Sequence, residues 1–378
     1  MDNKKNGIPK LRFPGFTGAW EQRKLGEVVE RFDNLRIPVT SSKREKGITP
    51  YYGANGIQDY VQGYTHDGEF VLVAEDGAND LQNYPVHYVN GKVWVNNHAH
   101  VLQGKKDIAD NLFLVNAIKR IKFETYLVGG SRAKLNADVM MKLPIKVPTL
   151  NEQQKLGKYF SRIDSLIALH QRKLEHLQEQ KKGLLQKMFP KNGETVPEVR
   201  FPGFTDAWEQ RKLGEVVERF DNLRIPVTSS KREKGITPYY GANGIQDYVQ
   251  GYTHDGEFVL VAEDGANDLQ NYPVHYVNGK VWVNNHAHVL QGKKDIADNL
   301  FLVNAIKRIK FETYLVGGSR AKLNADVMMK LPIKVPTLNE QQKLGKYFSR
   351  IDSLIALHQR KLEHLELMKK GLLQQMFV

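Results

Sequence analysis

RFPGFTGAWEQRKLGEVVERFDN stands at residues 12–34, and RFPGFTDAWEQRKLGEVVERFDN stands at residues 200–222. Outward from this pair the match continues, because every residue from Ala19 to Leu177 recurs 188 positions later, up to Leu365. A repeat of this length is a duplicated folding unit, since solenoid repeats are only about 20–50 residues long. The chain is therefore expected to fold as two copies of one unit.

Composition limits the class of protein. The 378 residues suit two or three domains at about 100–200 residues each. The 55 lysines and arginines outnumber the 42 acidic residues, and this net charge of +13 favours a polyanionic partner, with nucleic acid first. Without cysteine, the chain has no disulfide framework and no cysteine metal cluster. It lacks an apolar run of about 20 residues and a signal-peptide pattern, so we expect a cytoplasmic protein.

The first part of each unit, residues 11–148 and again 199–336, has the composition of a mixed α/β domain. Short apolar runs alternate with glycine and asparagine turns in residues 51–80, which predicts strands and loops. Residues 91–104 predict further strand structure, and residues 111–127 predict an amphipathic helix.

The second part of each unit, residues 149–189 and again 337–378, has the pattern of one long helix. Apolar residues recur at alternating steps of four and three for more than four heptads, which is typical of a coiled coil. His170 and Lys181 interrupt this seam, and we expect them to set its register. The residues predicted to pair the helices are Leu156, Phe160, Ile163, Ile167, Leu174, Leu177, Leu184, Leu344, Phe348, Ile351, Ile355, Leu362, Leu365 and Leu372.

A linker at residues 190–198 and a tail at residues 1–10 complete the division. Because the linker is short, the second globular part begins near the end of the first helix, ~57 Å from its start if the helix is unbroken. The second helix then returns toward the first globular part. We therefore expect the helices to pair antiparallel within the chain, relating two identical units by a two-fold axis.

Three segments of each unit have side chains suited to DNA. SSKREKG at 41–47 has three cations, and GGSRAKLN at 129–136 combines two glycines with donors of the kind used on phosphates and guanine edges. YYGANG at 51–56 places aromatic and amide side chains in a turn, although its tyrosines equally suit a core, and 41–47 equally suits a solvated loop. The predicted DNA-binding residues are Arg36, Lys43, Arg44, Lys46, Tyr51, Asn55, Asn79, Ser131, Arg132 and Lys134, with Arg224, Lys231, Arg232, Lys234, Tyr239, Asn243, Asn267, Ser319, Arg320 and Lys322 in the second copy.

Catalytic motifs are missing from the sequence. There is no phosphate-binding G-x-x-x-x-G-K-[ST] loop, and there is no N-P-P-[YF] or D-P-P-Y motif of an adenine methyltransferase. Glu75 and Asp76 lack a nearby acid-x-lysine triplet that a metal nuclease would need, which favours turn chemistry. His98 and His100 lie two residues apart without a ligand-like carboxylate pattern, so packing is favoured over zinc binding. We therefore expect a non-catalytic protein without a metal site or a cofactor of its own.

Several blocks occur in one order, twice. They are W-x-x-x-x-L-G-E-V from Trp20, then YYGANGI, VLVAEDGA and VWVNNHAHVL, then G-S-R-x-x-L-N at 130–136 and L-P-I-x-V-P-x-x-x-E-Q from Leu143. A long helix that ends in LLQKMF follows the first series. Over nearly all of its length the chain resembles the specificity subunit of a type I restriction-modification system.

This resemblance implies an α+β fold with two mixed α/β target recognition domains. Two long helices would separate them and form an intramolecular antiparallel coiled coil with pseudo-two-fold symmetry. It implies a non-catalytic subunit that binds double-stranded DNA and two methyltransferase subunits, while the restriction subunits bind through the methyltransferase core. S-adenosylmethionine, ATP and magnesium would belong to those partners.

Identical recognition domains depart from the family pattern, since members usually carry two different ones. Two identical domains related by a two-fold axis predict a palindromic target interrupted by unspecified bases. Two other classes stay open. One is an autonomous nuclease or methyltransferase, against which the missing motifs argue, and the other is a free-standing sequence-specific DNA-binding scaffold without modification partners.

Overall fold

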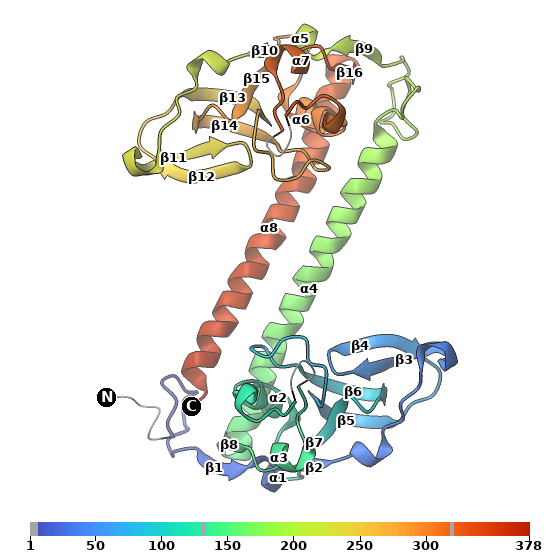
Figure 1. Ribbon diagram of the computed structural model, residues 1–378, viewed down its shortest axis with the longest axis vertical. Coiled ribbons are helices and arrows are strands. Elements are labelled where there is room, and N and C mark those ends of the chain that lie inside the picture. The colour runs from blue at the N-terminus through green and yellow to red at the C-terminus, as the bar shows by residue number, and fades with distance from the viewer. Residues whose placement is uncertain (1–6, 130–132, 318–320) are drawn as a thin grey trace. The chain divides into compact units, whose positions relative to one another are not determined.

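The computed structural model describes residues 7–129, 133–317 and 321–378. The chain divides into two compact units that differ from a division by repeats. The first unit is Met1–Gln171 with Arg360–Val378, and the second is Arg172–Gln359. Each unit therefore takes the globular part and the first half of the long helix from one repeat, together with the end of the long helix from the other. Figure 1 labels the elements.

A six-stranded sheet forms the centre of the first unit (Figure 1). Its strand order is β2-β7-β5-β6-β3-β4, and every neighbouring pair is antiparallel except β3 and β6. A separate pair joins β1 to β8. The strands are β1 (Glu21–Lys24), β2 (Val29–Arg31), β3 (Lys46–Gly53), β4 (Gly56–Val61), β5 (His66–Ala74), β6 (Val86–Val95), β7 (Ala99–Gly104) and β8 (Pro144–Val147).

The central strand β5 is covered on both faces, because its run Phe70–Ala74 is buried at every position. Val71 and Val73 point into the larger core, and Phe70 and Leu72 point into a smaller one on the other face. Continuous apolar runs are typical of strands buried on both sides. The predicted strand region 91–104 is confirmed as the end of β6 and all of β7.

Helix α2 (Asn111–Lys119) lies between the sheet and the start of the long helix. The side chain of Asp110 caps it by accepting a hydrogen bond from the Phe113 amide at 2.9 Å. Gly157 of the long helix allows this close approach, since a Cβ there would lie 2.4 Å from the Asp110 carboxylate. The prediction of an amphipathic helix over 111–127 was wrong in length and in character. All six residues from 113 to 118 are buried, and the chain leaves the helix so that Phe123 can stack on Tyr84 at 4.2 Å.

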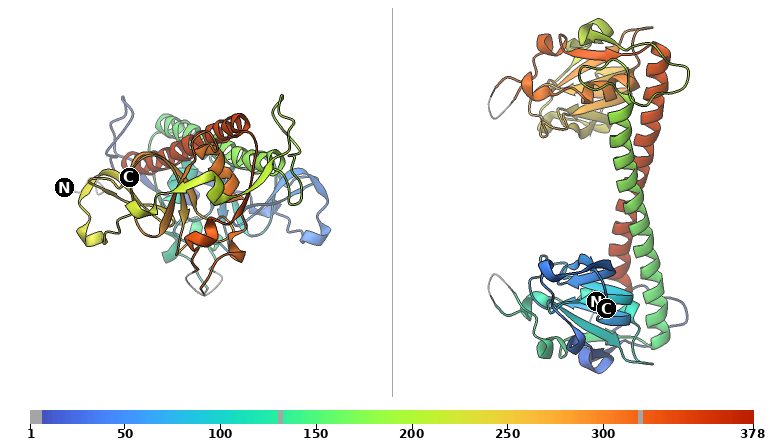
Figure 2. Two further views of the ribbon diagram at one scale, coloured as in Figure 1. Left: turned by 90° about the horizontal axis from the view of Figure 1, so that it is seen from above. Right: turned by 90° about the vertical axis from the view of Figure 1, so that its right-hand side faces the viewer.

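The long helices are α4 (Leu150–Met188) and α8 (Leu338–Met376), of 39 residues each. In the first unit the start of α4 lies beside the end of α8, as both views of Figure 2 show. The Phe160 ring lies 5.7 Å from that of Phe377, and Lys369 donates a hydrogen bond to Asp164. Residue numbers rise along α4 as they fall along α8, so the two segments pair antiparallel.

The second unit repeats this construction. Its sheet order is β10-β15-β13-β14-β11-β12, and β9 pairs with β16. Phe189, from the end of the first repeat's helix, packs on Trp208 at 5.4 Å and on Phe301 at 5.6 Å. The strands are β9 (Glu209–Lys212), β10 (Val217–Arg219), β11 (Lys234–Gly241), β12 (Gly244–Val249), β13 (His254–Ala262), β14 (Val274–Val283), β15 (Ala287–Gly292) and β16 (Pro332–Val335).

The remaining helices are short except for α6 (Asn299–Lys307), the counterpart of α2. The others are α1 (Leu25–Val28), α3 (Ala137–Met140), α5 (Leu213–Val216) and α7 (Ala325–Met328). Within the described residues, no helix has the length and apolar character needed to cross a membrane. The expected fold of two sheet-containing α/β domains with long helices is confirmed.

Candidate nucleic-acid interface

A network of charged side chains gathers where β5 ends and β7 begins. Glu75 accepts hydrogen bonds from Arg36 at 2.7 Å and from Lys134 at 3.0 Å. His100 donates from Nδ1 to Asp33 at 2.7 Å. Burial alone would raise the pKa of Asp33 and Glu75. The hydrogen bond and charge of His100 at Asp33, and the hydrogen bonds of Arg36 and Lys134 at Glu75, instead hold both pKa values below their ordinary range.

The same carboxylates and imidazole lie close enough to suggest a metal site. Their ligand atoms are already engaged, however. Asp33 also accepts from the Val101 amide at 2.7 Å, and the second ring nitrogen of His100 faces the Leu135 carbonyl at 2.9 Å. Two cationic side chains, Arg36 and Lys134, occupy the positions beside Glu75. This set does not fit a metal ion, and His98 turns instead to Asp76.

The network holds the base of the glycine-serine-arginine segment. The Leu135 amide donates to the Glu75 carbonyl at 2.6 Å, and Val128 and Lys134 exchange backbone hydrogen bonds at 2.9 and 2.8 Å. Val128 and Lys134 are therefore tied to each other, and Leu135 is tied to the chain just after β5. Four predicted DNA-binding residues, namely Ser131, Arg132, Ser319 and Arg320, lie outside the described residues.

Arg36 and Arg44 are used inside the domain. Arg36 donates to Glu75, to the Ala99 carbonyl at 2.8 Å and to the Asp33 carbonyl at 3.0 Å. Arg44 lies 4.1 Å above the ring of Tyr51. These contacts favour structural roles for both arginines, so their predicted part in DNA binding stays a prediction with little support.

Tyr51 is 1% exposed, and its hydroxyl bonds to the backbone of Val39. The sequence left open whether Tyr51 contacts DNA or belongs to the core, and in the structure it is a core residue. Asn55 ties two loops together, since it donates to the Gly77 carbonyl and accepts from the Asn79 amide, each at 2.9 Å. The second copy has the same contacts at Arg224, Arg232, Tyr239, Asn243 and Asn267.

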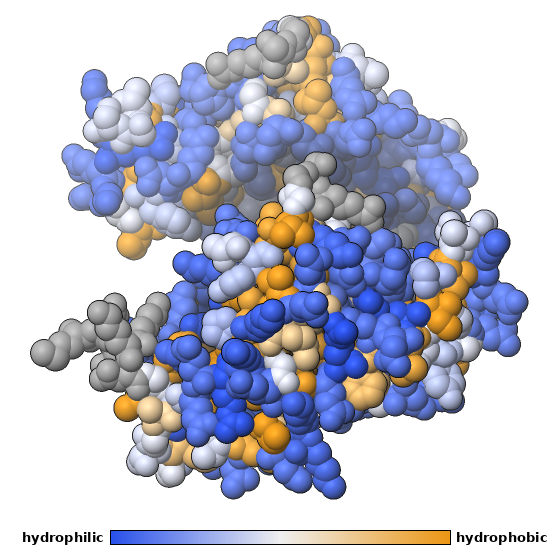
Figure 3. All heavy atoms as spheres, turned by 60° about the horizontal axis from the view of Figure 1, so that its bottom comes forward, coloured by the Kyte–Doolittle hydropathy of each residue, from blue (hydrophilic) through white to orange (hydrophobic). Residues whose placement is uncertain are grey.

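The side chains of Lys43, Lys46 and Asn79 are exposed, and so are their counterparts Lys231, Lys234 and Asn267. The Lys134 side chain is half exposed, and it is paired with Glu75. DNA binding by these residues stays a prediction. Figure 3 shows one largely hydrophilic face, with hydrophobic side chains in small groups.

A pocket of about 480 Å³ opens beside Asn55 and Asn79 in the first unit, and it extends to His87 and Lys119. The Nε2 atom of His87 is buried with no hydrogen-bond partner within the described ranges. Burial and the charge of Lys119 lower the pKa of His87. The ring is therefore neutral at pH 7.

The predicted seam residues have different environments. Leu156, Phe160 and Ile163 are buried in the core of their own globular domain as well as against the end of α8. Their counterparts Leu344, Phe348 and Ile351 do the same in the second unit. Ile167, Leu184, Ile355 and Leu372 pack partly on these cores, Leu174 and Leu362 are buried, and Leu177 and Leu365 are half-buried.

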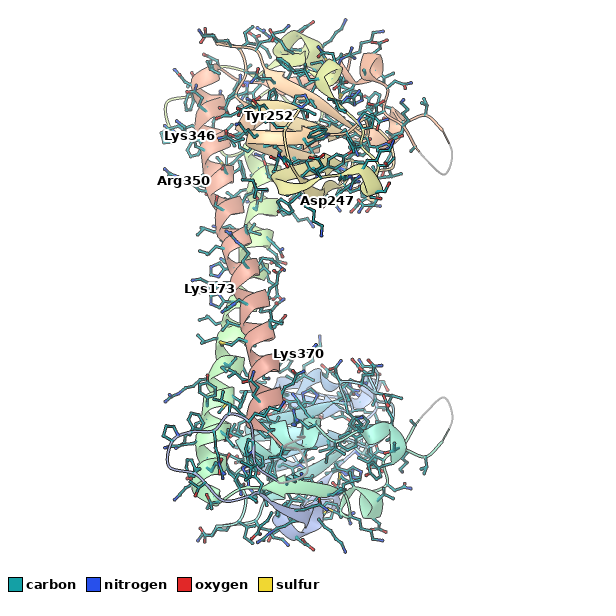
Figure 4. The ribbon with its side chains drawn as sticks, turned by 90° about the vertical axis from the view of Figure 1, so that its left-hand side faces the viewer. Lys173, Asp247, Tyr252, Lys346, Arg350 and Lys370 are labelled. Carbon is teal, nitrogen blue, oxygen red and sulfur yellow. The ribbon has the colours of Figure 1, made fainter. Side chains whose placement is uncertain are left out.

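A second stripe on the long helices was missed by the sequence reasoning. Lys155, Lys158, Arg162, Leu166 and Leu169 follow one another at steps of three and four, and all are exposed. The same stripe in the second unit is Lys343, Lys346, Arg350, Leu354 and Leu357. Lys346 and Arg350 project from one side of α8 (Figure 4). The spacing is present in the sequence, but the apolar seam of the same helices has nearly the same period and masks it.

Comparison with known proteins gives a consistent result. The chain matches the model of the type I restriction modification DNA specificity domain twice, over residues 18–179 and 205–367. A putative type I restriction enzyme specificity subunit of Haemophilus influenzae is 31% identical over 94% of this chain and 92% of its own length. The type I restriction enzyme MjaVIII specificity subunit of Methanocaldococcus jannaschii is 21% identical over 94% of this chain and 91% of its own length.

One solved structure has the same fold. The S subunit of a type I restriction-modification system from M. genitalium matches with a TM-score of 0.80 at 15% identity, over 98% of this chain and 99% of that chain.

Proposed function

Because the chain belongs to the family of type I restriction-modification DNA specificity proteins, we propose that it selects the DNA target for a methyltransferase and a restriction enzyme built around it. The observation that carries this function is the duplicated family match, with one match for each globular domain. The subunit is non-catalytic, as its family is. S-adenosylmethionine, ATP and magnesium are assigned to the partner subunits.

Each globular domain reads one half of the target. Lys43, Lys46 and Lys134 supply phosphate contacts, and Asn79 lies on an exposed loop that Asn55 holds. Arg36, Arg44 and Tyr51 act as the scaffold for these loops. Because the two domains have one sequence, both half-sites have one base sequence. The opposite orientation of the two half-sites on the two DNA strands remains a prediction, which follows from the short linker and the antiparallel helices.

The exposed helical stripe is the proposed docking surface for the methyltransferase subunits. Leu166 and Leu169 offer an apolar pair one turn apart, and Lys155, Lys158 and Arg162 extend it with positive charge. This chemistry suits an amphipathic partner helix that has an apolar stripe and acidic neighbours. The restriction subunits then bind through the methyltransferase core.

Co-expression with the cognate methyltransferase tests the proposal. We expect the two proteins to co-purify and N6-methyladenine to map to one interrupted sequence. Leu166→Asp with Leu354→Asp should abolish co-purification without unfolding the subunit, because both leucines are exposed. Leu367→Asp, at a more exposed leucine outside the stripe, is the matched control. Specific DNA binding without co-purification of the wild-type proteins would favour a free-standing scaffold instead.

A further inference from the structure

The strands β3 and β4 form a ribbon whose outer half leaves the sheet. β3 pairs with β6 only at Tyr51 and Tyr52, opposite Trp94 and Val95. From Lys46 to Pro50 the ladder of β3 therefore runs only to β4, the last strand of the sheet. A two-stranded ribbon of this kind fits the width of the DNA major groove.

A bulge in this ribbon exposes one apolar side chain. The register passes from Lys46 opposite Val61 to Thr49 opposite Val61, so Gly47 and Ile48 are looped out. A Cβ at Gly47 would lie 2.3 Å from the Val61 carbonyl oxygen, so only glycine fits there. Bulges commonly re-aim a side chain at a functional site. Here the bulge leaves Ile48 94% exposed, and Ile236 in the second unit is 93% exposed.

Folding does not account for an isoleucine in this position, because a side chain so exposed gains almost nothing from burial. It lies on an edge ribbon, where an apolar side chain invites aggregation. Three residues further along β3, the Tyr51 hydroxyl bonds to Val39 and Arg44 stacks on the Tyr51 ring, which ties this strand to the segment before it. The bulge therefore presents the Ile48 side chain to solvent from a strand that is anchored at Tyr51.

The surroundings of Ile48 suit a polyanion. Lys43 and Lys46 are exposed, and neither has an ion-pair partner in the part of the chain that the structure describes. The nearby carboxylate of Asp59 is shared with Arg44 at 3.4 Å. Lys46 lies two residues before Ile48 on the same strand and Lys43 lies just before that strand, so two lysines without carboxylate partners among the described residues precede Ile48 in the chain.

We propose that the β3–β4 ribbon enters the DNA major groove and that Ile48 makes an apolar contact with a thymine methyl group, so that it is a specificity-determining residue of each half-site. This inference rests on the proposed function. Apolar side chains distinguish thymine through its C5-methyl group, and lysines placed beside them fix the register on phosphates. Ile236 reads the equivalent thymine in the other half-site.

Uracil substitution tests the contact directly, after methylation mapping has given the target sequence. The complex with the methyltransferase is titrated with target DNA in which each thymine in turn is replaced by deoxyuridine. For wild type, removing one methyl group at one position of each half-site should weaken binding about fourfold per half-site, as expected for one buried methyl group. Ile48→Ala with Ile236→Ala should weaken binding to thymine DNA similarly and show no further loss with uracil.

Ile108→Ala with Ile296→Ala is the matched control, because these isoleucines are also exposed but lie in the turn before α2 or α6. Thermal unfolding should be the same for all variants. Unchanged DNA binding by the Ile48 variant, equal uracil effects in variant and wild type, or a half-site without thymine would overturn the inference and leave the proposed function intact. Weakened binding to the methyltransferase alone would assign Ile48 to a protein contact instead. Failure of the wild-type complex to bind any sequence specifically would overturn the proposed function itself.

Discussion

Glu75 binds the C-terminal part of the glycine-serine-arginine segment (residues 129–136) through both its side chain and its backbone. Its carboxylate accepts from Arg36 and Lys134, and its carbonyl accepts from the Leu135 amide. The sequence marked Glu75 as part of an acidic pair and indicated turn chemistry. Its charged partners come from positions 39 residues before and 59 residues after it, and no local spacing predicts such pairs.

Replacing this carboxylate should loosen the domain. Glu75→Gln with Glu263→Gln leaves Arg36 and Lys134 without their acceptor, and removing one partner of a part-buried charged pair costs about 1–3 kcal/mol. We expect a lower thermal midpoint and weaker DNA binding. Glu124→Gln with Glu312→Gln, at exposed glutamates, is the matched control. Equal midpoints for the two double variants would mean that the network adds nothing to stability.

The same groups predict an acid dependence. The folded pKa values of Asp33 and Glu75 lie below their ordinary values of 3.8 and 4.5. A lowered folded pKa stabilises the protein at pH above the ordinary value, and the gain is lost as the pH falls through the folded value. The unfolding midpoint should therefore fall as the pH drops below about 4.5. Glu75→Gln with Glu263→Gln should flatten this fall in thermal scans between pH 3 and 7, and an unaltered slope would contradict the assignment.

At the scale of elements, heptad spacing was sufficient to predict the long helices, because a seam of that period over more than four heptads is typical of paired helices alone. It did not show which surface covers the seam. Phe160 and Ile163 contact their own domain as well as the other helix, since the start of α2 approaches α4 closely at Gly157. Apolar residues also continue past Lys119, and for this reason the sequence pattern predicted a helix that is longer than α2. In the structure the chain leaves the helix after Lys119, and Phe123 stacks on Tyr84.

The end of α8 should control the stability of the first unit. Phe377 packs on Trp20, Phe113 and Phe160, at 5.6, 5.4 and 5.7 Å between ring centroids. Phe377→Ala should destabilise the first unit by about 3–5 kcal/mol. Hydrogen exchange should rise in residues 7–129 and stay unchanged in the sheet of the second unit. Leu367→Ala, at a leucine that is 71% exposed, should change neither, and protection that falls equally in both units would contradict this localised effect.

At the scale of the whole molecule, two identical recognition domains predict a DNA target whose two half-sites have the same base sequence. If the helices set the distance between these domains, lengthening both helices by one heptad adds ~10 Å and should lengthen the unspecified spacer by about three base pairs at ~3.4 Å each. Methylation mapping gives both the half-sites and the spacer. Adding seven residues to the linker at 190–198 instead should leave the spacer as it was. Two unrelated half-sites, or a spacer that does not respond to helix length, would refute this geometry.

The exchange of helix ends has a consequence during synthesis. Trp20 and Phe113 leave the ribosome early, but their ring partner Phe377 is added more than 260 residues after Phe113. The first unit therefore cannot complete its core while the second repeat is translated. Until the end of α8 is synthesised, the apolar surface around Trp20 and Phe113 stays uncovered. A chain cut short by a premature stop presents that open surface to chaperones and proteases. We expect such a fragment to be degraded faster than the full chain.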